Sequence, residues 1–564
     1  MPPLMLPLAH SLSMMAAIAA MRGRASDAAD LSRVAARLAS GERDPAHTDT
    51  GTVREALARI RDIGPESAID EALAEVPQDL RRLATSRHLD VPAVAELHRL
   101  TGATSLGELN DRLGSEGLIG ALEPTLIERA RAAIAQASAT RPRIPLGRAW
   151  SLLDPILTAI RDASPEIERI VATGSFRRFA AVTGDLEVLA VSADPARTSA
   201  RLLGLPFISS VLHAGREKVV VRFDRAEVTI HIVTPGAFVP RLVSLTGSAT
   251  HVAQVRQRAA SLGLTLTRDA LIDHDGRARA IASEDDLYAA LDLAPVAPEL
   301  REGAGEVEAA ARRELPRLLC HEQIRGDLHM HTDWSDGRDP LEAMLLAAEA
   351  LGYEYVAITD HSQTSAIARG LDVDRLERQI EAVAAAREQH PTMAILQGSE
   401  VDILPDGSLD FPDQVLERLD VVLASLHDMA GHSSAQLTDR YIRAMRNPFV
   451  HIVTHPTNRL VPNREGYTLD EPRLFDAAVQ TGTVLEIDGA PGHLDMDGAM
   501  ARRAVAAGAL VSVDGDCHRA DLLGRHMLFA VGTARRGWVE ARHAVNALPL
   551  EGLRARLTAK RQAS

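Results

Sequence analysis

The C-terminal part of the chain alternates short apolar strands with helical stretches, and this alternation restricts the fold more than any other feature. Between residue 324 and about residue 535, the sequence predicts seven strands, at residues 324–331, 355–361, 393–400, 421–427, 449–455, 483–488 and 509–518. Helix-like segments separate several of them, for example residues 339–352, 373–390 and 497–509. Because strands joined through helices form a largely parallel sheet, seven such units predict a closed or nearly closed α/β barrel.

Every one of these predicted strands ends in His, Asp or Glu. In α/β barrels, groups at the carboxyl ends of the strands gather in one cleft even when they are far apart in sequence. A single histidine at a strand end is more often a structural residue, but here nine polar residues lie at or just past the strand ends in register. They are His329, His331, Asp336, His361, Glu400, His427, His455, Asp516 and His518. This pattern predicts a metal site.

The types of these nine residues restrict the metal and its chemistry. Imidazole and carboxylate ligands without thiolate suit manganese, zinc or iron better than calcium or magnesium. Nine ligands exceed the needs of one ion, so two or three divalent ions are expected, and such clusters hydrolyse phosphate esters. The remaining histidines of this part are interpreted as ordinary surface or core residues: His321, His390, His432, His451, His493 and His526.

Composition excludes several other classes of protein. At 564 residues the chain predicts several domains, and its two cysteines exclude a disulfide framework. The net charge of −15 argues against a general nucleic-acid-coating surface. No apolar run approaches a membrane span, and the basic residues near the start follow the apolar stretch, the wrong order for a secretory signal. We therefore expect a cytoplasmic protein that does not contact membranes. Of the possible oligomeric states, we favour a monomer.

The segments 329–337, 358–362, 398–404, 425–427, 454–460 and 516–518 resemble the successive motifs of the PHP domain, named for polymerase and histidinol phosphatase. The resemblance implies a distorted (β/α)7 barrel with a metal cluster held by the nine residues above. It implies that His329, His331, Asp336 and Glu400 are catalytic and that Glu400 bridges two metals. The D-x-H pattern favours Asp516 over Asp514. Arg459 and Arg464 match basic positions that would bind a substrate phosphate, although solvated surface arginines are the alternative.

The N-terminal part is helical in pattern up to about residue 150 and rich in short β-like runs from about residue 165 to 235. Its segments 174–178, 245–259 and 298–310 resemble bacterial and archaeal family X DNA polymerases that carry a C-terminal PHP domain. The resemblance implies a multidomain chain: a helix-hairpin-helix-like 8-kDa domain at 1–95, a fingers-like helical region at 96–150, an α+β nucleotidyltransferase-like palm at 151–235, a thumb-like subdomain and linker at 236–315, and the PHP domain at 320–560.

The polymerase site of that family matches this chain incompletely. The GSFRR motif retains Gly174, Ser175 and Arg178, and the first palm strand has Asp185 and Glu187, but Thr229 stands where the third carboxylate is needed. A neutral hydroxyl cannot replace a charged ligand at magnesium. The hairpins at 59–70 and 83–97 have also lost glycines that permit close approach to DNA phosphates. The sequence therefore argues against a magnesium site in the palm and against efficient polymerisation.

The resulting expectation is a metal-dependent phosphoesterase that acts on DNA 3′ ends as a 3′-5′ exonuclease, with small phosphate esters as the other class of substrate. Three alternatives remain open at this point. One is a bifunctional repair polymerase and exonuclease, the second is a small-molecule phosphatase similar to histidinol phosphatase, and the third is a non-catalytic docking module whose metals only stabilise the fold.

Overall fold

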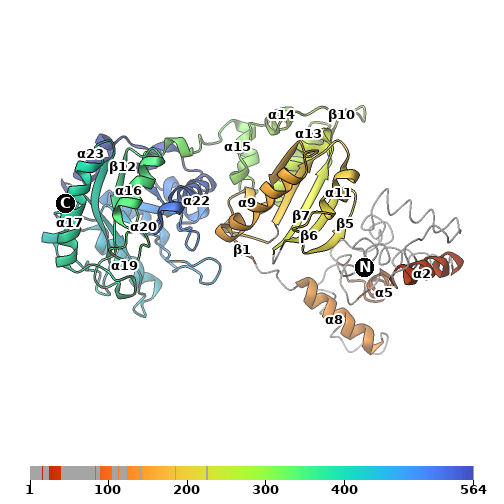
Figure 1. The fold of residues 1–564 in the computed structure, drawn as a ribbon, viewed down its shortest axis with the longest axis horizontal. Helices are drawn as coiled ribbons and strands as arrows, with labels where there is room; N and C mark the ends of the chain where they lie inside the picture. Colours follow the sequence, from red (N-terminus) through yellow and green to blue (C-terminus); the bar gives the residue numbers. More distant parts are fainter. Residues whose placement is uncertain are drawn as a thin grey trace. The chain divides into compact units, whose positions relative to one another are not determined.

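A computed structural model of the chain describes residues 25–39, 91–103, 123–138, 143–184, 186–223 and 226–562, together with residues 16, 80, 83, 89, 109, 112 and 113. The chain divides into two compact units whose segments interleave along the sequence. Figure 1 labels their helices and strands and colours them by position in the chain. The first unit contains Met1–Arg143, Leu152–Ala172 and Gly184–Phe238, and the second contains Ile144–Ser151, Thr173–Thr183 and Val239–Ser564.

The first unit contains three described helices at its N-terminal end, α2 (Ala25–Ala39), α5 (Val91–Thr101) and α8 (Pro124–Ser138). Apolar residues recur at helical spacing in α5 and α8, and they are buried together in one cluster. Leu97 of α5 and Ala130 of α8 both belong to it. The helical pattern predicted at residues 125–137 corresponds to α8. The helical pattern at residues 52–63 and the hairpin at 59–70 lie outside the described residues.

A five-stranded sheet is the centre of the remaining described part of the first unit. Its strand order is β2 (Arg169–Ala172), β4 (Leu186–Val191), β7 (Ala226–Val233), β6 (Lys218–Phe223) and β5 (Ser210–Ala214). Strands β4 and β7 are parallel, and the other neighbours are antiparallel. Helix α11 (Pro195–Leu203) packs on β6 and β7. The side chains of β6 alternate between more and less buried positions, as expected when one face of a sheet packs on a core.

The second unit begins with two short segments. Ile144–Ser151 contains the first residues of α9 (Leu146–Ala163), and Thr173–Thr183 contains α10 (Gly174–Arg177). A thumb-like part follows, with α12 (Phe238–Thr246), α13 (Ala249–Ser261), the strands β8 (Thr265–Leu266), β9 (Leu271–Ile272) and β10 (Ala278–Arg279), α14 (Glu284–Ala290) and α15 (Glu306–Arg312). Its core contains His251, whose two ring nitrogens lie 2.6 Å from Glu306 and 3.0 Å from the hydroxyl of Tyr288.

The largest element of the second unit is a parallel sheet in which the strands are ordered as in the sequence. They are β11 (Gly326–Asp327), β12 (Tyr355–Ile358), β13 (Ala394–Asp402), β14 (Val421–Ser425), β15 (Ile452–Val453), β16 (Val484–Asp488) and β17 (Val511–Asp514). The backbone N–H of His331 donates to the carbonyl of Cys517 at 3.0 Å and links the two edge strands just beyond their ends. The predicted nearly closed barrel of seven parallel strands is confirmed.

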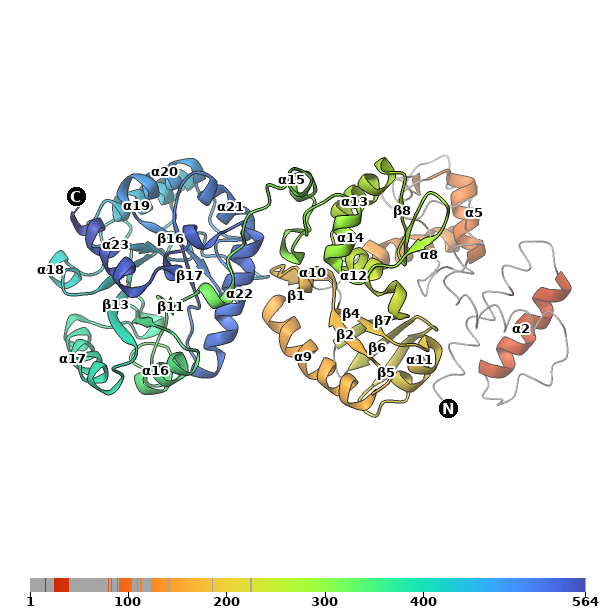
Figure 2. The same cartoon turned by 90° about the horizontal axis from the view of Figure 1, so that it is seen from above.

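Helices surround this barrel (Figure 2), and buried residues of its strands and of these helices form one apolar cluster. They are α16 (Leu341–Ala350), α17 (Val373–Gln389), α18 (Asp413–Leu416), α19 (Ser434–Met445), α20 (Glu471–Thr481), α21 (Gly498–Ala506), α22 (Leu523–Arg536) and α23 (Leu550–Gln562). All four residues of β12 are buried, as expected for a parallel strand covered on both faces. Among the described residues, no helix has the length and apolarity needed to cross a membrane.

Candidate metal centre

The nine residues predicted as metal ligands come together at the carboxyl ends of the barrel strands. Three overlapping groups offer ligand atoms that all lie within 4.8 Å of one another. They are His331, Asp336, His361 and His518; His329, His331 and Asp516; and His361, Glu400 and His427. His455 reaches the last group through Glu400.

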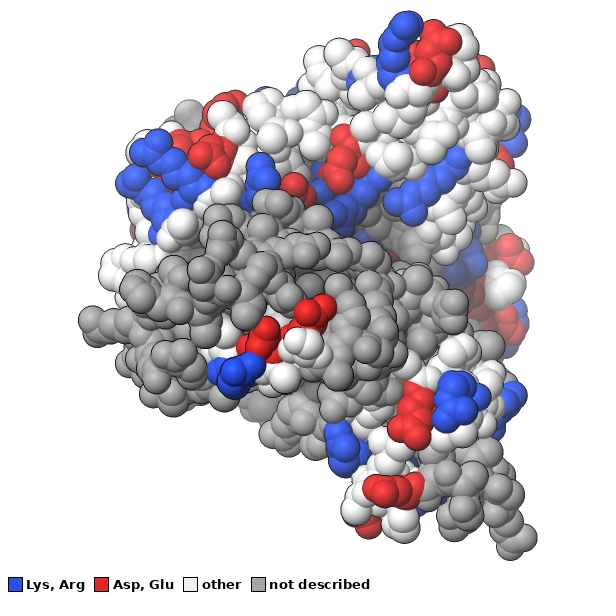
Figure 3. All heavy atoms as spheres, turned by 90° about the vertical axis from the view of Figure 1, so that its right-hand side faces the viewer, with Lys and Arg blue, Asp and Glu red and all other residues white. Residues whose placement is uncertain are grey.

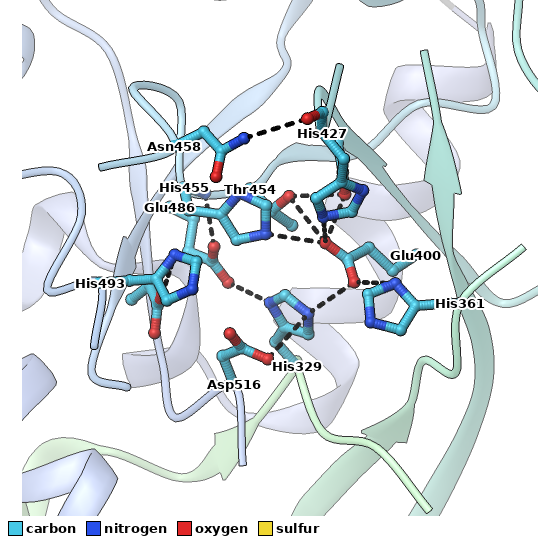
Figure 4. A network of polar contacts seen from close by, with 12 residues as sticks. His329, His361, Glu400, His427, Thr454, His455, Asn458, Glu486, His493 and Asp516 are labelled. Atoms are coloured by element: carbon cyan, nitrogen blue, oxygen red, sulfur yellow. Dashed lines mark hydrogen bonds and ion pairs between the residues drawn. The ribbon is translucent and has the colours of Figure 1, made fainter. Parts of the chain in front are cut away.

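Glu400, on β13, lies in the middle of this arrangement. One of its oxygens is 2.8 Å from Nδ1 of His361, and the other is 2.8 Å from Nε2 of His455 and 3.5 Å from Nε2 of His427. Figure 4 shows the two oxygens pointing to opposite sides of the cluster. A carboxylate with this placement can bridge two cations. Burial alone would raise the pKa of Glu400, but His361 and His329 hold it well below its usual range.

His329 and His331 face each other across the first strand end. Their Nε2 atoms are 3.0 Å apart, and Oδ1 of Asp516 is 3.2 Å from Nε2 of His331. Two imidazole nitrogens at this separation, with a carboxylate beside them, match the donor set of a cation that both rings coordinate. Asp516 also has a left-handed φ of 42°, as His455 has with 22°. Such backbone costs about 1–3 kcal/mol in a non-glycine residue and clusters at functional sites.

A second group of the predicted ligands lies toward the surface. Oδ1 of Asp336 is 3.2 Å from Nε2 of His518 and 3.7 Å from Nε2 of His361. Burial would raise the pKa of Asp336, but the imidazoles of His518, His331 and His361 lower it to about 2. This carboxylate therefore carries a negative charge at any physiological pH and can neutralise a bound cation.

The residues fit a metal cluster on two independent grounds. Among the described residues, Nδ1 of His331 and Nδ1 of His455 are buried without a hydrogen-bond partner. Burial would also lower the pKa of His329, yet the surrounding carboxylates raise it well above its usual value. Unpartnered buried nitrogens and a surplus of buried negative charge are both compensated when cations bind.

Two carboxylates that we did not predict as site residues orient these ligands. Glu486, inside β16, lies 2.6 Å from Nδ1 of His329, and Asp402, at the end of β13, lies 2.7 Å from Nδ1 of His427. Contacts of this kind fix which nitrogen of a histidine faces the metal. In the sequence the signal is weak, because both acids lie within strand-like runs of apolar residues.

His493 is closer to the centre than its place outside the predicted pattern indicates. It lies in the loop at residues 489–497, after β16, and its ring centroid is 5.4 Å from that of His455. Burial and the neighbouring His455 lower the pKa of His493 to about 4. Its Nδ1 is 3.9 Å from Oδ2 of Asp488. This neutral histidine lines the wall of the site beside the ligands.

Asp514 and Asp516 occupy different environments, although they are two residues apart. Asp514 accepts hydrogen bonds from the backbone N–H of Leu328 at 2.8 Å and from Nδ2 of Asn546 at 2.7 Å, so it ties the first strand to the last. Asp516 is the one that faces His331. This geometry supports Asp516 as the ligand.

The two arginines predicted to bind phosphate have protein partners. Arg459 donates from Nε to the carbonyl of His493 at 2.9 Å and also contacts the carbonyl of Leu494. Arg464 is exposed, and its Nη2 donates to the carbonyl and side-chain oxygens of Asn458 at 2.7 and 2.8 Å. Arg464 therefore fixes the loop that follows His455 to itself, and Arg459 links this loop to residues 493 and 494.

The polymerase-like residues are distributed over both units. In the first unit, Glu187 of β4 is the register partner of Thr229 on β7, and its carboxylate lies 3.6 Å from Nε2 of His231. Asp185 lies outside the described residues. A threonine therefore stands beside Glu187 on the neighbouring strand, at the position predicted for the third carboxylate.

The other polymerase-like residues, Gly174, Ser175 and Arg178, belong to the second unit. Gly174 adopts a φ of 66°, which glycine tolerates without strain, and Oγ of Ser175 donates to Oγ1 of Thr183 at 2.8 Å. Arg178 donates from Nε to Glu302 at 2.9 Å and from Nη1 to the carbonyl of Thr246 at 2.8 Å. The guanidinium of Arg178 is thus held by the thumb-like part.

Charges on the described surface are mixed. Figure 3 shows Lys and Arg interspersed with Asp and Glu over the described part of one face of the molecule.

Known proteins match both parts of the chain. Residues 241–302 match the DNA polymerase beta thumb, and residues 327–465 match the PHP domain. The DNA polymerase/3'-5' exonuclease PolX of Bacillus subtilis (strain 168) is 33% identical over 501 residues, which cover 88% of this chain and 87% of that protein. A probable phosphatase of Thermoanaerobacter sp. (strain X514) is 30% identical over 215 residues, 35% of this chain and 81% of that protein.

A probable phosphatase of Shewanella oneidensis is likewise 30% identical over 212 residues, which cover 35% of this chain and 78% of that protein. The phosphatases thus match a third of the chain, whereas the match to the Bacillus subtilis protein extends over almost the full length of both. Together with the seven-stranded barrel and the thumb, that match shows that this chain belongs to the PolX family.

Proposed function

We propose that this chain is a metal-dependent phosphoesterase that removes nucleotides from the 3′ ends of DNA. The observation that carries the proposal is the position of Glu400, whose two oxygens each lie 2.8 Å from a histidine on opposite sides, His361 and His455. A structural metal site usually closes with four ligands around one ion. Nine ligand residues around a shared carboxylate instead match a catalytic cluster of two or three ions.

The nine residues have distinct tasks in this proposal. His329, His331, Asp336 and Glu400 hold the ions next to the scissile ester, and His361, His427, His455, Asp516 and His518 complete the ligand set. The bound ions supply Lewis acidity, which activates water and polarises a phosphoryl oxygen. The imidazole and carboxylate ligands favour manganese, zinc or iron. Glu486 and Asp402 keep the ligand nitrogens of His329 and His427 directed at the ions.

DNA is the favoured substrate because the polymerase-like part has been retained. The Bacillus subtilis relative is named as both a DNA polymerase and a 3'-5' exonuclease, and its similarity covers 88% of this chain. We propose the domain limits given above, with the helical N-terminal region, palm and thumb serving to hold DNA, in a monomer located in the cytoplasm. Arg459 and Arg464 follow the ligand His455 in the chain and are proposed to contact a substrate phosphate by exchanging their present partners, His493 and Asn458.

Polymerisation is proposed to be absent or very weak. The partner of Glu187 on the neighbouring strand is Thr229, and a neutral hydroxyl does not hold magnesium as a carboxylate does. Arg178 of the GSFRR motif pairs with Glu302. The palm is therefore proposed to bind DNA without transferring nucleotides to it.

A phosphatase acting on small phosphate esters is the second candidate. It is supported by the similarity to the probable phosphatase of Thermoanaerobacter sp. The match covers 81% of that protein but only 35% of this chain. Phosphodiesterases and phosphomonoesterases share ligand sets and differ in the loops above the barrel, so the ligands alone do not separate the two.

A direct comparison of substrates tests the proposal. The purified, manganese-loaded chain is incubated with a 5′-labelled DNA oligonucleotide and, separately, with a chromogenic phosphate monoester. Stepwise shortening of the oligonucleotide supports the exonuclease. Hydrolysis of the monoester alone would favour the phosphatase and refute the DNA-end function.

A further inference from the structure

Two short segments from the polymerase-like part of the sequence belong to the same compact unit as the barrel. They are Ile144–Ser151, at the start of α9, and Thr173–Thr183, which contains the GSFRR motif. We call them the docking segments. Figure 2 shows β1 (Ile144–Pro145) and α10 beside α22 of the barrel. The chain passes from one unit to the other and back at these two points.

An aromatic cluster joins the docking segments to the barrel. The ring of Trp150 lies 5.4 Å from Phe176 and 6.3 Å from Phe179 of the second segment, and 5.6 Å edge-on from Phe529 of α22. Phe529 is fully buried. Pairs of aromatic rings at these distances contribute about 0.5–1.5 kcal/mol each beyond the area that they bury. The partly buried rings of Trp150, Phe176 and Phe179 therefore pack against the buried cluster that contains Phe529.

The fit between the segments and the barrel depends on two glycines. A Cβ atom at Gly532 of α22 would lie 2.2 Å from the ring of Phe179. A Cβ atom at Gly147 of α9 would lie 2.4 Å from Cβ of Pro491. Neither distance occurs between real Cβ atoms and their neighbours, so any larger residue at Gly147 has to push α9 and Pro491 apart.

Pro491 belongs to the loop at residues 489–497, which we call the wall loop because it carries His493 beside the metal centre. Leu494 of the same loop is buried in a cluster with Leu146 and Phe529. The wall loop therefore meets the first docking segment through Pro491, and its Leu494 shares a buried cluster with Leu146 of that segment.

The wall loop in turn braces the segment that carries the ligand His455. The carbonyl of His493 accepts from Nε of Arg459 at 2.9 Å, and Oδ2 of Asp495 accepts from the backbone N–H of Thr457 at 2.9 Å. The backbone N–H of Val461 donates to the carbonyl of Gly492 at 2.7 Å. A shift of the wall loop is thus passed to both sides of the metal centre, to His493 directly and to His455 through these hydrogen bonds.

We propose that Gly147 and Trp150 are positioning residues for the metal centre of the barrel. They act through Pro491 and Leu494, fix the wall loop and so place His493 and His455. Hydrolysis by the barrel then depends on how the docking segments pack against it within the second unit. The inference rests on the proposed phosphoesterase activity and adds residues that lie far from the metal-binding motifs in sequence.

The experiment measures single-turnover shortening of a 5′-labelled oligonucleotide by full-length, manganese-loaded wild type and Gly147→Ala, over a range of enzyme concentrations. Because small displacements of catalytic groups are costly, the maximal rate of Gly147→Ala is expected to fall by about tenfold to a hundredfold. The enzyme concentration that gives half-maximal rate and the manganese content should stay unchanged, whereas the melting temperature should fall by a few degrees, because overpacking at Gly147 destabilises the fold. The control is Gly236→Ala, since a Cβ atom at Gly236 meets nothing within 4 Å.

A rescue separates positioning from general damage. Pro491→Gly removes the atoms that an alanine at position 147 would strike, so Gly147→Ala combined with Pro491→Gly should regain most of the maximal rate. If Gly147→Ala does not fold, Trp150→Leu replaces it and is expected to lower the maximal rate in the same way.

Four outcomes overturn an assignment. Inactive wild type refutes the proposed function itself. Active wild type with an equally fast Gly147→Ala refutes the positioning role alone. A change confined to the half-maximal concentration would assign the docking segments to DNA binding instead, and a double variant as slow as Gly147→Ala would refute the contact with Pro491 as the cause.

Discussion

The carboxylate of Glu486 lies 2.6 Å from Nδ1 of His329, on the side of the imidazole opposite to the nitrogen that faces the other ligands. Both residues are fully buried. The ring of His329 therefore cannot rotate without breaking a buried, charge-assisted contact. Glu486 also accepts from the backbone N–H of His455 at 2.7 Å, so one carboxylate orients two ligands.

Replacing this carboxylate is expected to weaken metal binding without removing a ligand. Glu486→Gln should lower the affinity for manganese by about 10–100-fold, the usual effect of losing a partner that orients a metal-bound histidine. The measurement is a calorimetric titration of the metal-free protein with manganese, for wild type and for Glu486→Gln. An unchanged affinity would show that Glu486 serves only the packing of the barrel.

Asp514 and Asp516 give a matched pair for testing which carboxylate is a ligand. Asp516→Asn is expected to lose metal and hydrolysis, because Asp516 faces His331 at 3.2 Å. Asp514→Asn is expected to retain both and to lower the stability of the barrel by about 1–3 kcal/mol, since it perturbs the buried hydrogen bonds from Leu328 and Asn546. Metal content and urea unfolding of the two variants provide the comparison, and metal loss in Asp514→Asn alone would reverse the assignment.

The free energy of unfolding of the thumb-like part is expected to fall at low pH because of Glu284. Burial alone would raise the pKa of Glu284, but the guanidinium groups of Arg177 and Arg301 lower it from 4.5 to about 2. A carboxylate whose pKa is lower in the folded state stabilises the fold fully above pH 4.5, and this stabilisation is lost as the pH falls toward 2. Its size is at most about 3 kcal/mol.

The check is urea unfolding of wild type and Glu284→Gln at several pH values. The variant should be less stable at pH 7, and the difference should shrink progressively below pH 4.5. Asp285→Asn, one residue away and exposed, is the control and should differ little from wild type at any pH. A difference between wild type and Glu284→Gln that does not change with pH would contradict the role of the ion pairs.

The polymerase-like part is expected to leave a primer unextended. Wild type incubated with a primer–template, all four deoxynucleoside triphosphates and magnesium or manganese should give no template-directed product, because Thr229 stands beside Glu187 where a carboxylate is needed. Asp336→Ala serves as the background for this assay, since it removes shortening that would hide extension. Template-dependent extension would restore the bifunctional alternative.

The barrel and the gathering of the nine predicted residues could be predicted from sequence because both depend on local patterns. Strand and helix alternate with clear periodicity, and a parallel barrel brings every strand end to one edge, so residues as distant as His329 and His518 meet there. The same rule fails for Glu486. This residue lies within β16 and contacts Nδ1 of His329, the ring nitrogen that faces away from the other predicted ligands. Its role depends on which strand faces it, and sequence periodicity does not contain that information.

The docking segments could not be predicted for a related reason. Gly147 and Trp150 belong by sequence to the helical start of the polymerase-like part, yet they pack on Pro491 and Phe529 of the barrel. Contacts between residues more than 300 positions apart leave no local pattern. His493 was interpreted as an ordinary histidine because its loop lacks the strand-end register, and only its 5.4 Å distance from His455 reveals its place.

The central claim is that the nine-residue centre hydrolyses phosphate esters at DNA 3′ ends, and one measurement tests it most directly. Manganese-loaded wild type and Asp336→Ala are compared on the same 5′-labelled oligonucleotide, with the melting temperature of each recorded. We predict stepwise shortening by wild type that is abolished in Asp336→Ala, while the melting temperatures stay nearly equal. An oligonucleotide left intact by wild type, or shortened equally by both proteins, would contradict the account.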